Sequence, residues 1–542
     1  MTDVAHVVVQ TVAVALVAAS VSGIARRIGC PAPIALVAAG LGVSVLAAVL
    51  PLHVPALAVD PELVLYVFLP PLLYSAALES SYLNIRRNLR PILHLSVGLV
   101  VFTAAAVACV AHWFAGLPWV AAFVLGAVVA PPDAVAATAL GRTLGLPRRL
   151  LTILGGESLF NDATALTLFR LGVLAATAGA VTYSQAAGTF VVAAVGGVAV
   201  GLLVAPVIHQ LRIRLREPVL ENAFAVLLPF AVYVLAETFD ASGVLAVVVL
   251  GLYLGHREAE TTFAVRLQAR AVWRMLDFLL ESVVFLLIGL EITPIVQRAM
   301  YVADGAELVV YGLAVLAVVV LARAVWVFGA TLLPRGFSLR SRMRDARPSW
   351  AEATVLSWAG MRGVVSLAAA LAIPPAVGDG RFLVVYLTVC VVFGTLVLHG
   401  LTLPWLVRRL GVVGGEGMAD LLAEAQAQHA AARAAVDRLD ALLAQGVELP
   451  DGVEQRLRDH AEHRANSAWE RLGRGGVMTS LSEPASAELE TPAEAFRRLR
   501  RDMLTAERAV FVDMRNTGRI DDEILRRVLN ELDLEEAILA RD

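Results

Sequence analysis

The chain of 542 residues contains no lysine, so arginine supplies all 44 of its basic side chains. This absence excludes a titrating lysine from any proton-linked chemistry. Cysteine is also rare: Cys30, Cys109 and Cys390 are the only three, and they lie far apart. Their spacing fits neither a metal site nor a disulfide framework, so we expect them to be packing residues.

Charged residues are scarce, at 17% of the chain against 58% hydrophobic residues. One soluble core cannot absorb so much apolar sequence, and apolar runs recur with lengths near the roughly 20 residues that a spanning helix needs. The pattern predicts an all-α polytopic membrane protein with thirteen transmembrane helices. The predicted spans are 4–23, 31–50, 61–79, 91–115, 119–140, 149–175, 186–208, 219–239, 241–256, 271–291, 305–333, 350–373 and 382–406.

The arginines gather in alternate loops between these segments. The intervening loops hold only Arg298 and Arg381. Because basic loops stay in the cytoplasm, the pattern predicts an outside N-terminus, an inside C-terminus and an odd number of spans in the cytoplasmic membrane. The first segment is expected to be retained rather than cleaved, because its basic pair, Arg26 and Arg27, follows the apolar run instead of preceding it.

The composition changes after residue 410. Residues 1–410 carry a net charge of +6 and residues 411–542 a net charge of −9, which gives the −3 of the whole chain. We therefore expect a transmembrane domain (1–410) and a cytoplasmic helical tail (411–542) that acts as a solvated stalk, stabilises a dimer or regulates the membrane domain. The tail shows no nucleotide or calcium motif, and neither a cofactor nor a nucleic-acid partner is expected.

Two carboxylates stand inside the apolar segment from 150 to 178. The run Gly156-Glu157-Ser158-Leu159-Phe160-Asn161-Asp162 contains both of them. Ionisable groups at that depth are rare because hydrocarbon solvates them badly, and they usually mark an ion pathway. This segment predicts function more directly than any other.

A double proline interrupts the fifth segment at Ala130-Pro131-Pro132-Asp133. Two consecutive prolines remove backbone donors, so upstream carbonyls lose their intrahelical partners and are tolerated only if buried or coordinating something. Asp133 could cap the restarted helix or coordinate a cation, and the sequence leaves both roles open.

The twelfth segment carries a buried arginine between two glycines, in the run Gly360-Met361-Arg362-Gly363. A guanidinium at that depth needs a carboxylate or carbonyl partner, and Glu157 is the natural candidate. Arg323 in the eleventh segment is a rival or additional partner. If the thirteen segments divide into two six-helix repeats, the interrupted fifth and twelfth occupy corresponding positions, as in an inverted-repeat transporter with discontinuous crossing helices.

These motifs resemble those of the bacterial monovalent cation:proton antiporters, the sodium/proton exchanger family. The matching runs stand in family order at 131–136, 156–162, 285–291 and 360–363, and the resemblance spans roughly residues 5–410. It implies a transporter rather than an enzyme, thirteen helices in inverted repeats, and a homodimer whose core domain moves against a dimerisation domain. It also implies a role in pH and sodium homeostasis.

The resemblance makes Asp162 the carboxylate that binds either a proton or the transported cation. Desolvation disfavours the charge of a buried carboxylate, so the two ions can compete for it. Ser158 can add a hydroxyl oxygen, and carbonyls at Ala130 and Pro131 can complete the shell. Asn161 is expected to orient the broken helix, while Glu157 and Arg362 are the implied structural ion pair. No structural metal is expected.

The same branch implies electroneutral exchange of one cation for one proton. The motif here is Asn161-Asp162 rather than two adjacent aspartates, and no lysine is present to carry a second proton. The chain departs from several family members at Ser75, where they have an acid. Ser75 is a further candidate ligand, and ion preference cannot be copied from those members.

Other interpretations remain open in the sequence. Asp277 and Glu281 share a helix face and could form an entrance funnel or pair locally with Arg270 and Arg274. Exchange of K⁺ instead of Na⁺ or Li⁺ is the principal alternative function. A cation channel and an intramembrane aspartic protease are disfavoured because neither a Thr-Val-Gly-Tyr-Gly filter nor a Gly-x-Gly-Asp motif occurs.

Overall fold

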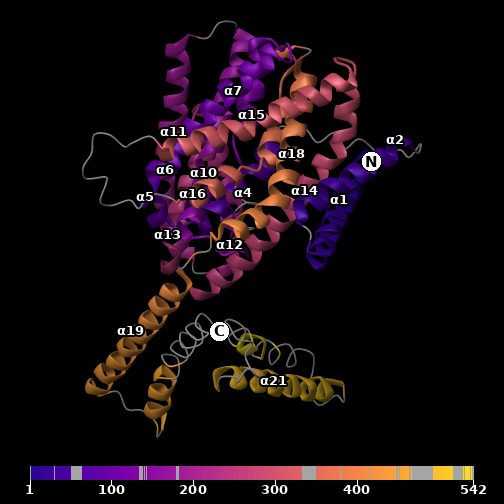
Figure 1. The fold of residues 1–542 in the computed structure, drawn as a ribbon. Coiled ribbons are helices and arrows are strands. Elements are labelled where there is room, and N and C mark those ends of the chain that lie inside the picture. Colours follow the sequence, from indigo (N-terminus) through magenta and orange to yellow (C-terminus); the bar gives the residue numbers. More distant parts are fainter. Residues whose placement is uncertain are drawn as a thin grey trace. The chain divides into compact units, whose positions relative to one another are not determined.

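The computed structural model of the chain is helical throughout its described residues (Figure 1). These are residues 2–29, 31–49, 64–133, 138, 141, 143–178, 182–215, 217–332, 349–378, 380–412, 414, 416–446, 450, 452–462, 466, 492–516, 529, 532–536 and 539. They form two compact units, residues 1–414 and 415–542.

The first unit is a bundle of helices joined by short connections. In chain order its elements are α1 (Thr2–Arg27), α2 (Ala32–Val49), η1 (Val64–Phe68), α4 (Leu69–Glu79), α5 (Tyr82–Arg87), α6 (Leu89–Leu93), η2 (His94–Leu99), α7 (Val100–Trp113), α8 (Trp119–Val129), α10 (Arg148–Ala178), α11 (Tyr183–Leu215), α12 (Pro218–Glu237), α13 (Gly243–His256), η3 (Glu258–Glu260), α14 (Phe263–Ala299), α15 (Gly305–Leu332), α16 (Trp350–Trp358), α17 (Val364–Leu371), η4 (Pro375–Val377) and α18 (Gly380–Leu410).

Seven helices within the described residues are long and apolar enough to cross a membrane. They are 89–113, 148–177, 184–215, 218–237, 264–299, 305–331 and 380–410, and three shorter apolar helices cover 32–47, 119–129 and 243–256. Each segment predicted from hydropathy contains at least one described helix, and the later part of the segment 119–140 lies largely outside the described residues. Predicted ends fall short where arginines extend a helix, as in α14, which begins at Phe263 rather than near residue 271.

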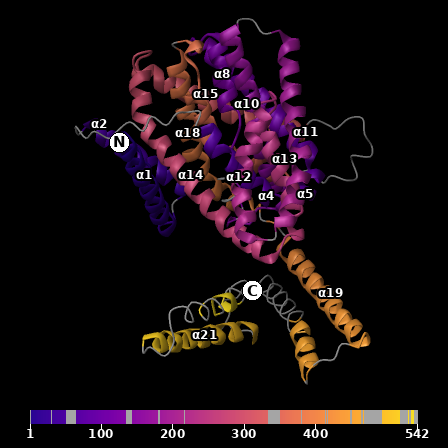
Figure 2. The ribbon, with the colours of Figure 1, turned by 180° about the vertical axis from the view of Figure 1, so that it is seen from behind.

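The long helix α14 packs against α1 and α2, which lie beside it in both views (Figures 1 and 2). The closest approach is between Gly40 of α2 and Gly289 of α14. A Cβ atom at Gly40 would lie 2.3 Å from the carbonyl of Leu286, and one at Gly289 would lie 2.3 Å from the carbonyl of Val37. Small residues allow such crossings in membranes, so the 285–291 motif contributes to packing here.

Two helices are interrupted where the sequence predicts. The first, α8, ends at Val129, directly before the double proline, and the pair α16 and α17 is separated by residues 359–363. A capping box between Ser349 and Glu352 starts α16, and α17 restarts after the extended residue Gly363. The two interruptions lie against each other, because the backbone N–H of Asp133 donates to the carbonyl of Met361 at 2.7 Å.

The second unit contains α19 (Glu416–Ala444) and α21 (Pro492–Asn516). Ion pairs join α21 to the following segment, for example Arg500 to Glu535 at 2.7 Å and Arg508 to Asp533 at 2.7 Å. The Arg500 guanidinium lowers the pKa of Glu535. Solvated ion pairs of this kind fit a polar helical tail, but each contributes little stability.

Candidate functional site

Helix α10 presents two polar faces. Glu157 and Asn161, four residues apart, share one face and are 1% and 0% exposed. Ser158 and Asp162 share another face, which lines a cavity. The first face therefore attaches α10 to its neighbours, and the second is directed into open space.

Glu157 forms a bidentate ion pair with Arg323 of α15. Nη1 of Arg323 donates to Oε1 at 2.5 Å and Nη2 donates to Oε2 at 2.8 Å, while both side chains are only 1% exposed. Nε of the same guanidinium donates to the carbonyl of Leu356 at 3.1 Å, near the end of α16. The predicted direct pair between Glu157 and Arg362 is therefore wrong, and the rival partner Arg323 occupies the position.

Arg362 instead donates hydrogen bonds to backbone carbonyls of the interrupted helices. It donates to the carbonyls of Val129 at 2.9 Å, Ala130 at 3.1 Å and Gly360 at 2.6 Å. The carbonyls of Val129 and Ala130 lie at the C-terminal end of α8, where helix carbonyls lack intrahelical donors, and a guanidinium with five N–H groups supplies donors to them. The prediction that Ala130 keeps an unpartnered carbonyl for a cation is therefore wrong. Pro131 does line the cavity.

Asn161 connects α10 to the interruption of α8. Its Nδ2 donates to the carbonyl of Pro132 at 2.6 Å, a contact compatible with the orienting role predicted for it. The alternative in which Asp133 caps a restarted helix concerns residues 134–137, which lie outside the described part of the chain. The side chain of Asp133 lines the cavity.

Gly363 leaves room for Asp133. A Cβ atom at this position would lie 1.9 Å from Oδ2 of Asp133 and 2.5 Å from its Cβ and Cγ.

Gly363→Ala is therefore expected to destabilise the fold by about 1–3 kcal/mol, because the side chain of Asp133 or the backbone of the interruption must shift. The thermal unfolding midpoint in detergent measures this effect. Gly42→Ala is the matched control, since a Cβ at Gly42 meets nothing within 4 Å, and equal midpoints for the two variants would contradict the expectation.

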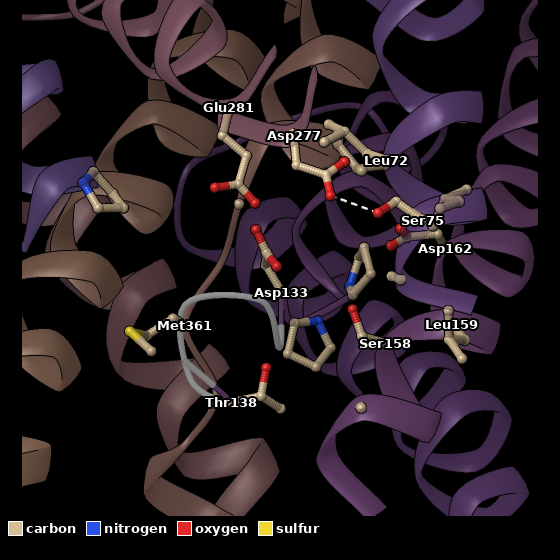
Figure 3. A pocket seen from close by; sticks show the side chains of 18 of the residues that line it. Leu72, Ser75, Asp133, Thr138, Ser158, Leu159, Asp162, Asp277, Glu281 and Met361 are labelled. Carbon is tan, nitrogen blue, oxygen red and sulfur yellow. Dashed lines mark hydrogen bonds between the residues drawn. The ribbon is translucent and has the colours of Figure 1, made fainter. Parts of the chain in front are cut away.

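The cavity has a volume of about 940 Å³ and opens between helices α1, α4, α10 and α14 and the two interruptions. Figure 3 shows carboxylates and hydroxyls from several helices directed into it. Arg26 is the one cationic side chain among the described residues that line it. Its polar lining otherwise consists of Ser75, Glu79, Ser80, Ser81, Asp133, Thr138, Thr143, Thr152, Ser158, Asp162, Asp277, Glu281 and Ser366.

Asp162 is 6% exposed and reaches this cavity. Within the described part of the chain, no basic side chain forms an ion pair with it, in contrast to Glu157 one turn earlier. The carboxylate of Asp133 lies within electrostatic reach of it. A carboxylate that is buried without a cationic partner needs a mobile cation or a proton to offset its charge.

Asp277 and Glu281 also belong to the cavity. The sequence favoured local pairing with Arg270 and Arg274, but Arg274 is exposed and its Nε donates to the carbonyl of Arg270. Asp277 instead accepts a hydrogen bond from Ser75 at 2.5 Å. The entrance funnel therefore fits the structure. The acidic and basic residues of this helix could not, from the sequence alone, distinguish a funnel from local ion pairs.

Comparisons with known proteins identify the family and the fold of the chain. The family profile described as sodium/hydrogen exchanger, transmembrane, matches residues 12–409. An uncharacterised Na⁺/H⁺ exchanger of Mycobacterium tuberculosis is 36% identical over 89% of this chain and 88% of that protein. The Na⁺/H⁺ antiporter ApNhaP of Aphanothece halophytica is 31% identical over 71% of each chain.

A solved structure shares the fold. The sodium proton antiporter MjNhaP1 of Methanocaldococcus jannaschii aligns with a TM-score of 0.60 and 18% sequence identity, covering 75% of this chain and 99% of that one. At that identity the likeness concerns the fold alone. It supports an all-helical, multi-pass membrane protein.

Proposed function

The chain belongs to the sodium/hydrogen exchanger family, and we propose that it exchanges Na⁺ for H⁺ across the cytoplasmic membrane by alternating access. The family is one of transporters and not of enzymes. The observation that carries the proposal is Asp162, a buried carboxylate that no basic side chain of the described residues pairs with and that faces a cavity lined in part by carboxylates and hydroxyls.

Competition at one carboxylate explains how two ions are coupled. Burial disfavours the charged carboxylate unless a proton or a cation neutralises it, so the site is occupied by one or the other whenever it crosses the membrane. Binding of Na⁺ displaces the proton, and binding of a proton displaces Na⁺. Each reorientation of the site then carries one Na⁺ in one direction or one proton in the other.

Side-chain oxygens are available to complete the cation shell. Ser158 lies one turn before Asp162 on the same helix face, and Asp133 contributes a second carboxylate from the interrupted helix. Hydroxyl and carboxylate oxygens are hard ligands that suit alkali cations. Arg362 donates a hydrogen bond to the carbonyl of Ala130. We therefore assign fewer of the cation ligands to backbone carbonyls than the sequence suggested.

Two contacts that join α10 to the interrupted helices support movement of these helices as one body. Arg323 joins α10 to the end of α16, and Asn161 joins α10 to the interruption of α8. In the proposed cycle these elements move together, so Asp162 keeps its surroundings while its access changes. The thirteen-helix inverted repeat and the homodimer implied by the sequence belong to this proposal.

The cavity faces the cytoplasm in the proposed orientation. Its lining includes Arg26, Ser81 and Thr143, which adjoin the arginine-rich loops. Toward the opposite end of α10, Arg170 pairs with Glu237 of α12. We assign this arrangement to an inward-facing state, with the N-terminus outside and the tail in the cytoplasm.

Potassium exchange is the second candidate. A Bacillus subtilis relative, 29% identical over 72% of this chain and 60% of its own length, is named a sodium, potassium, lithium and rubidium/H⁺ antiporter. The ligand types in the cavity suit any alkali cation, so a transport measurement must name the ion.

Proton efflux from acid-loaded proteoliposomes tests the proposal. Addition of Na⁺ is expected to start efflux, and the rate is expected to be equal with the membrane potential clamped at zero or at about 60 mV. Equal rates are expected because one cation exchanges for one proton: Asn161 does not titrate, and the chain has no lysine. A rate that follows the potential would contradict electroneutrality, and efflux with K⁺ but not Na⁺ would select the second candidate.

A further inference from the structure

Ser75 and Asp277 form a hydrogen-bonded pair between two helices of the cavity. The Ser75 hydroxyl, on α4, donates to Oδ2 of Asp277, on α14, at 2.5 Å, and Ser75 is 4% exposed. In the view of Figure 3 this hydroxyl lies between the carboxylates of Asp277 and Asp162. Helix α4 packs against both α14 and α10, so Ser75 lies on a helix that contacts the two helices carrying Asp277 and Asp162.

The other oxygen of Asp277 has no hydrogen-bond partner among the described residues. Its Oδ1 is buried and accepts no hydrogen bond from the described residues. Neither Arg274 nor Arg26 pairs with it among the described residues, since Arg274 donates to the carbonyl of Arg270 and the guanidinium of Arg26 lies 4.8 Å from the ring of Phe278. A buried carboxylate oxygen without a donor is costly, and a cation removes that cost.

A second buried polar atom in the cavity also lacks a partner. Ser366 of α17 is 1% exposed and lines the cavity, and its hydroxyl forms no hydrogen bond within the described part of the chain. Native proteins rarely leave such groups unsatisfied unless an ion, a water molecule or a ligand serves them. Two residues of the cavity lining, Asp277 and Ser366, therefore each carry a buried oxygen without a hydrogen-bond partner among the described residues.

We propose that Asp277, held in place by Ser75, is a second carboxylate that binds the transported monovalent cation on its way to Asp162. This inference rests on the proposed exchange function. The bond from Ser75 restricts rotation of the carboxylate and leaves Oδ1 as the oxygen that binds the ion. The neighbouring acids Glu79 and Glu281 raise the local cation concentration, and Arg26 is the one described cationic group of the cavity.

Asp277→Asn tests the role with little change of shape. Asparagine keeps an oxygen that accepts from Ser75, so the helix contact persists while the charge is lost. In proteoliposomes the KM for Na⁺ is expected to rise about tenfold with the maximal rate within about threefold, as for the loss of one charge-assisted contact. Ser75→Ala is expected to raise the KM about threefold. Glu291→Gln, on the same helix but outside the cavity lining, is the control and is expected to leave the KM unchanged.

An exchange of the two residues separates ion binding from a structural role. The double variant Ser75→Asp with Asp277→Ser moves the carboxylate across the hydrogen bond, and the KM is expected to return to within about threefold of the unmodified protein. An unchanged KM in Asp277→Asn, or a double variant no better than Asp277→Ser alone, would overturn the proposal. Absence of cation-driven efflux in the unmodified protein would instead contradict the exchange function itself.

Discussion

Asp162→Asn is expected to abolish cation-driven proton exchange, with a loss of about 100-fold or more in the rate. The amide has nearly the same shape as the carboxylate, but it neither accepts a proton near neutral pH nor offsets the charge of a cation. Proton efflux from acid-loaded proteoliposomes, measured on adding Na⁺, Li⁺ or K⁺, gives the rate.

Folding and transport must be separated in that experiment. Asp162→Asn removes a buried charge that has no basic partner among the described residues, so its thermal unfolding midpoint is expected to equal or exceed that of the unmodified protein. Asp304→Asn makes the same chemical change at an exposed position and is expected to transport normally. Exchange that persists in well-folded Asp162→Asn would mean that another group carries the proton.

Arg323→Met is expected to destabilise the protein by about 3–5 kcal/mol. The change leaves Glu157 charged and buried at 1% exposure, and a buried charge that loses its partner is costly. It also removes the donor to the carbonyl of Leu356 at the end of α16. The thermal unfolding midpoint in detergent and the yield of monodisperse protein measure the effect. Arg298→Met, at an exposed position, is the control and is expected to cost less than about 0.5 kcal/mol.

A double variant identifies the partner of Glu157. Adding Glu157→Gln to Arg323→Met removes the unpaired charge, and it is expected to recover part of the lost stability. Adding Glu157→Gln to Arg362→Met is expected to give no such recovery, because Arg362 serves the carbonyls of Val129, Ala130 and Gly360. Recovery with Arg362 but not with Arg323 would contradict the observed pairing.

Hydropathy and backbone chemistry predicted the elements of the fold well. Apolar length alone located the helices, because hydrocarbon imposes the same length on each of them. The interruptions at the double proline and at Gly360 were predictable as well, since proline lacks a donor and glycine tolerates unusual backbone geometry. Helix ends were less predictable: α11 continues through Arg212 and Arg214 to Leu215, seven residues beyond the predicted end.

The partners of the buried charges could not be predicted from the sequence. That a buried arginine needs a carboxylate or carbonyl follows from desolvation, but which one it finds depends on helix packing. Arg362 donates to carbonyls at the C-terminal end of α8, and Arg323 donates to Glu157. The partner of Asp277 could not be predicted for the same reason, because Ser75 lies 202 positions away in the chain.

The central claim is that a proton and a cation compete for Asp162, and the pH dependence of the KM for Na⁺ tests it most directly. As the pH falls, protons occupy the carboxylate in more of the molecules, so more Na⁺ is needed to displace them. The KM is therefore expected to rise toward tenfold per pH unit at acidic pH, while the maximal rate of Na⁺ exchange for Na⁺ stays constant. A KM that does not change with pH, with a maximal rate that falls instead, would show that the two ions bind at separate groups and would contradict the account.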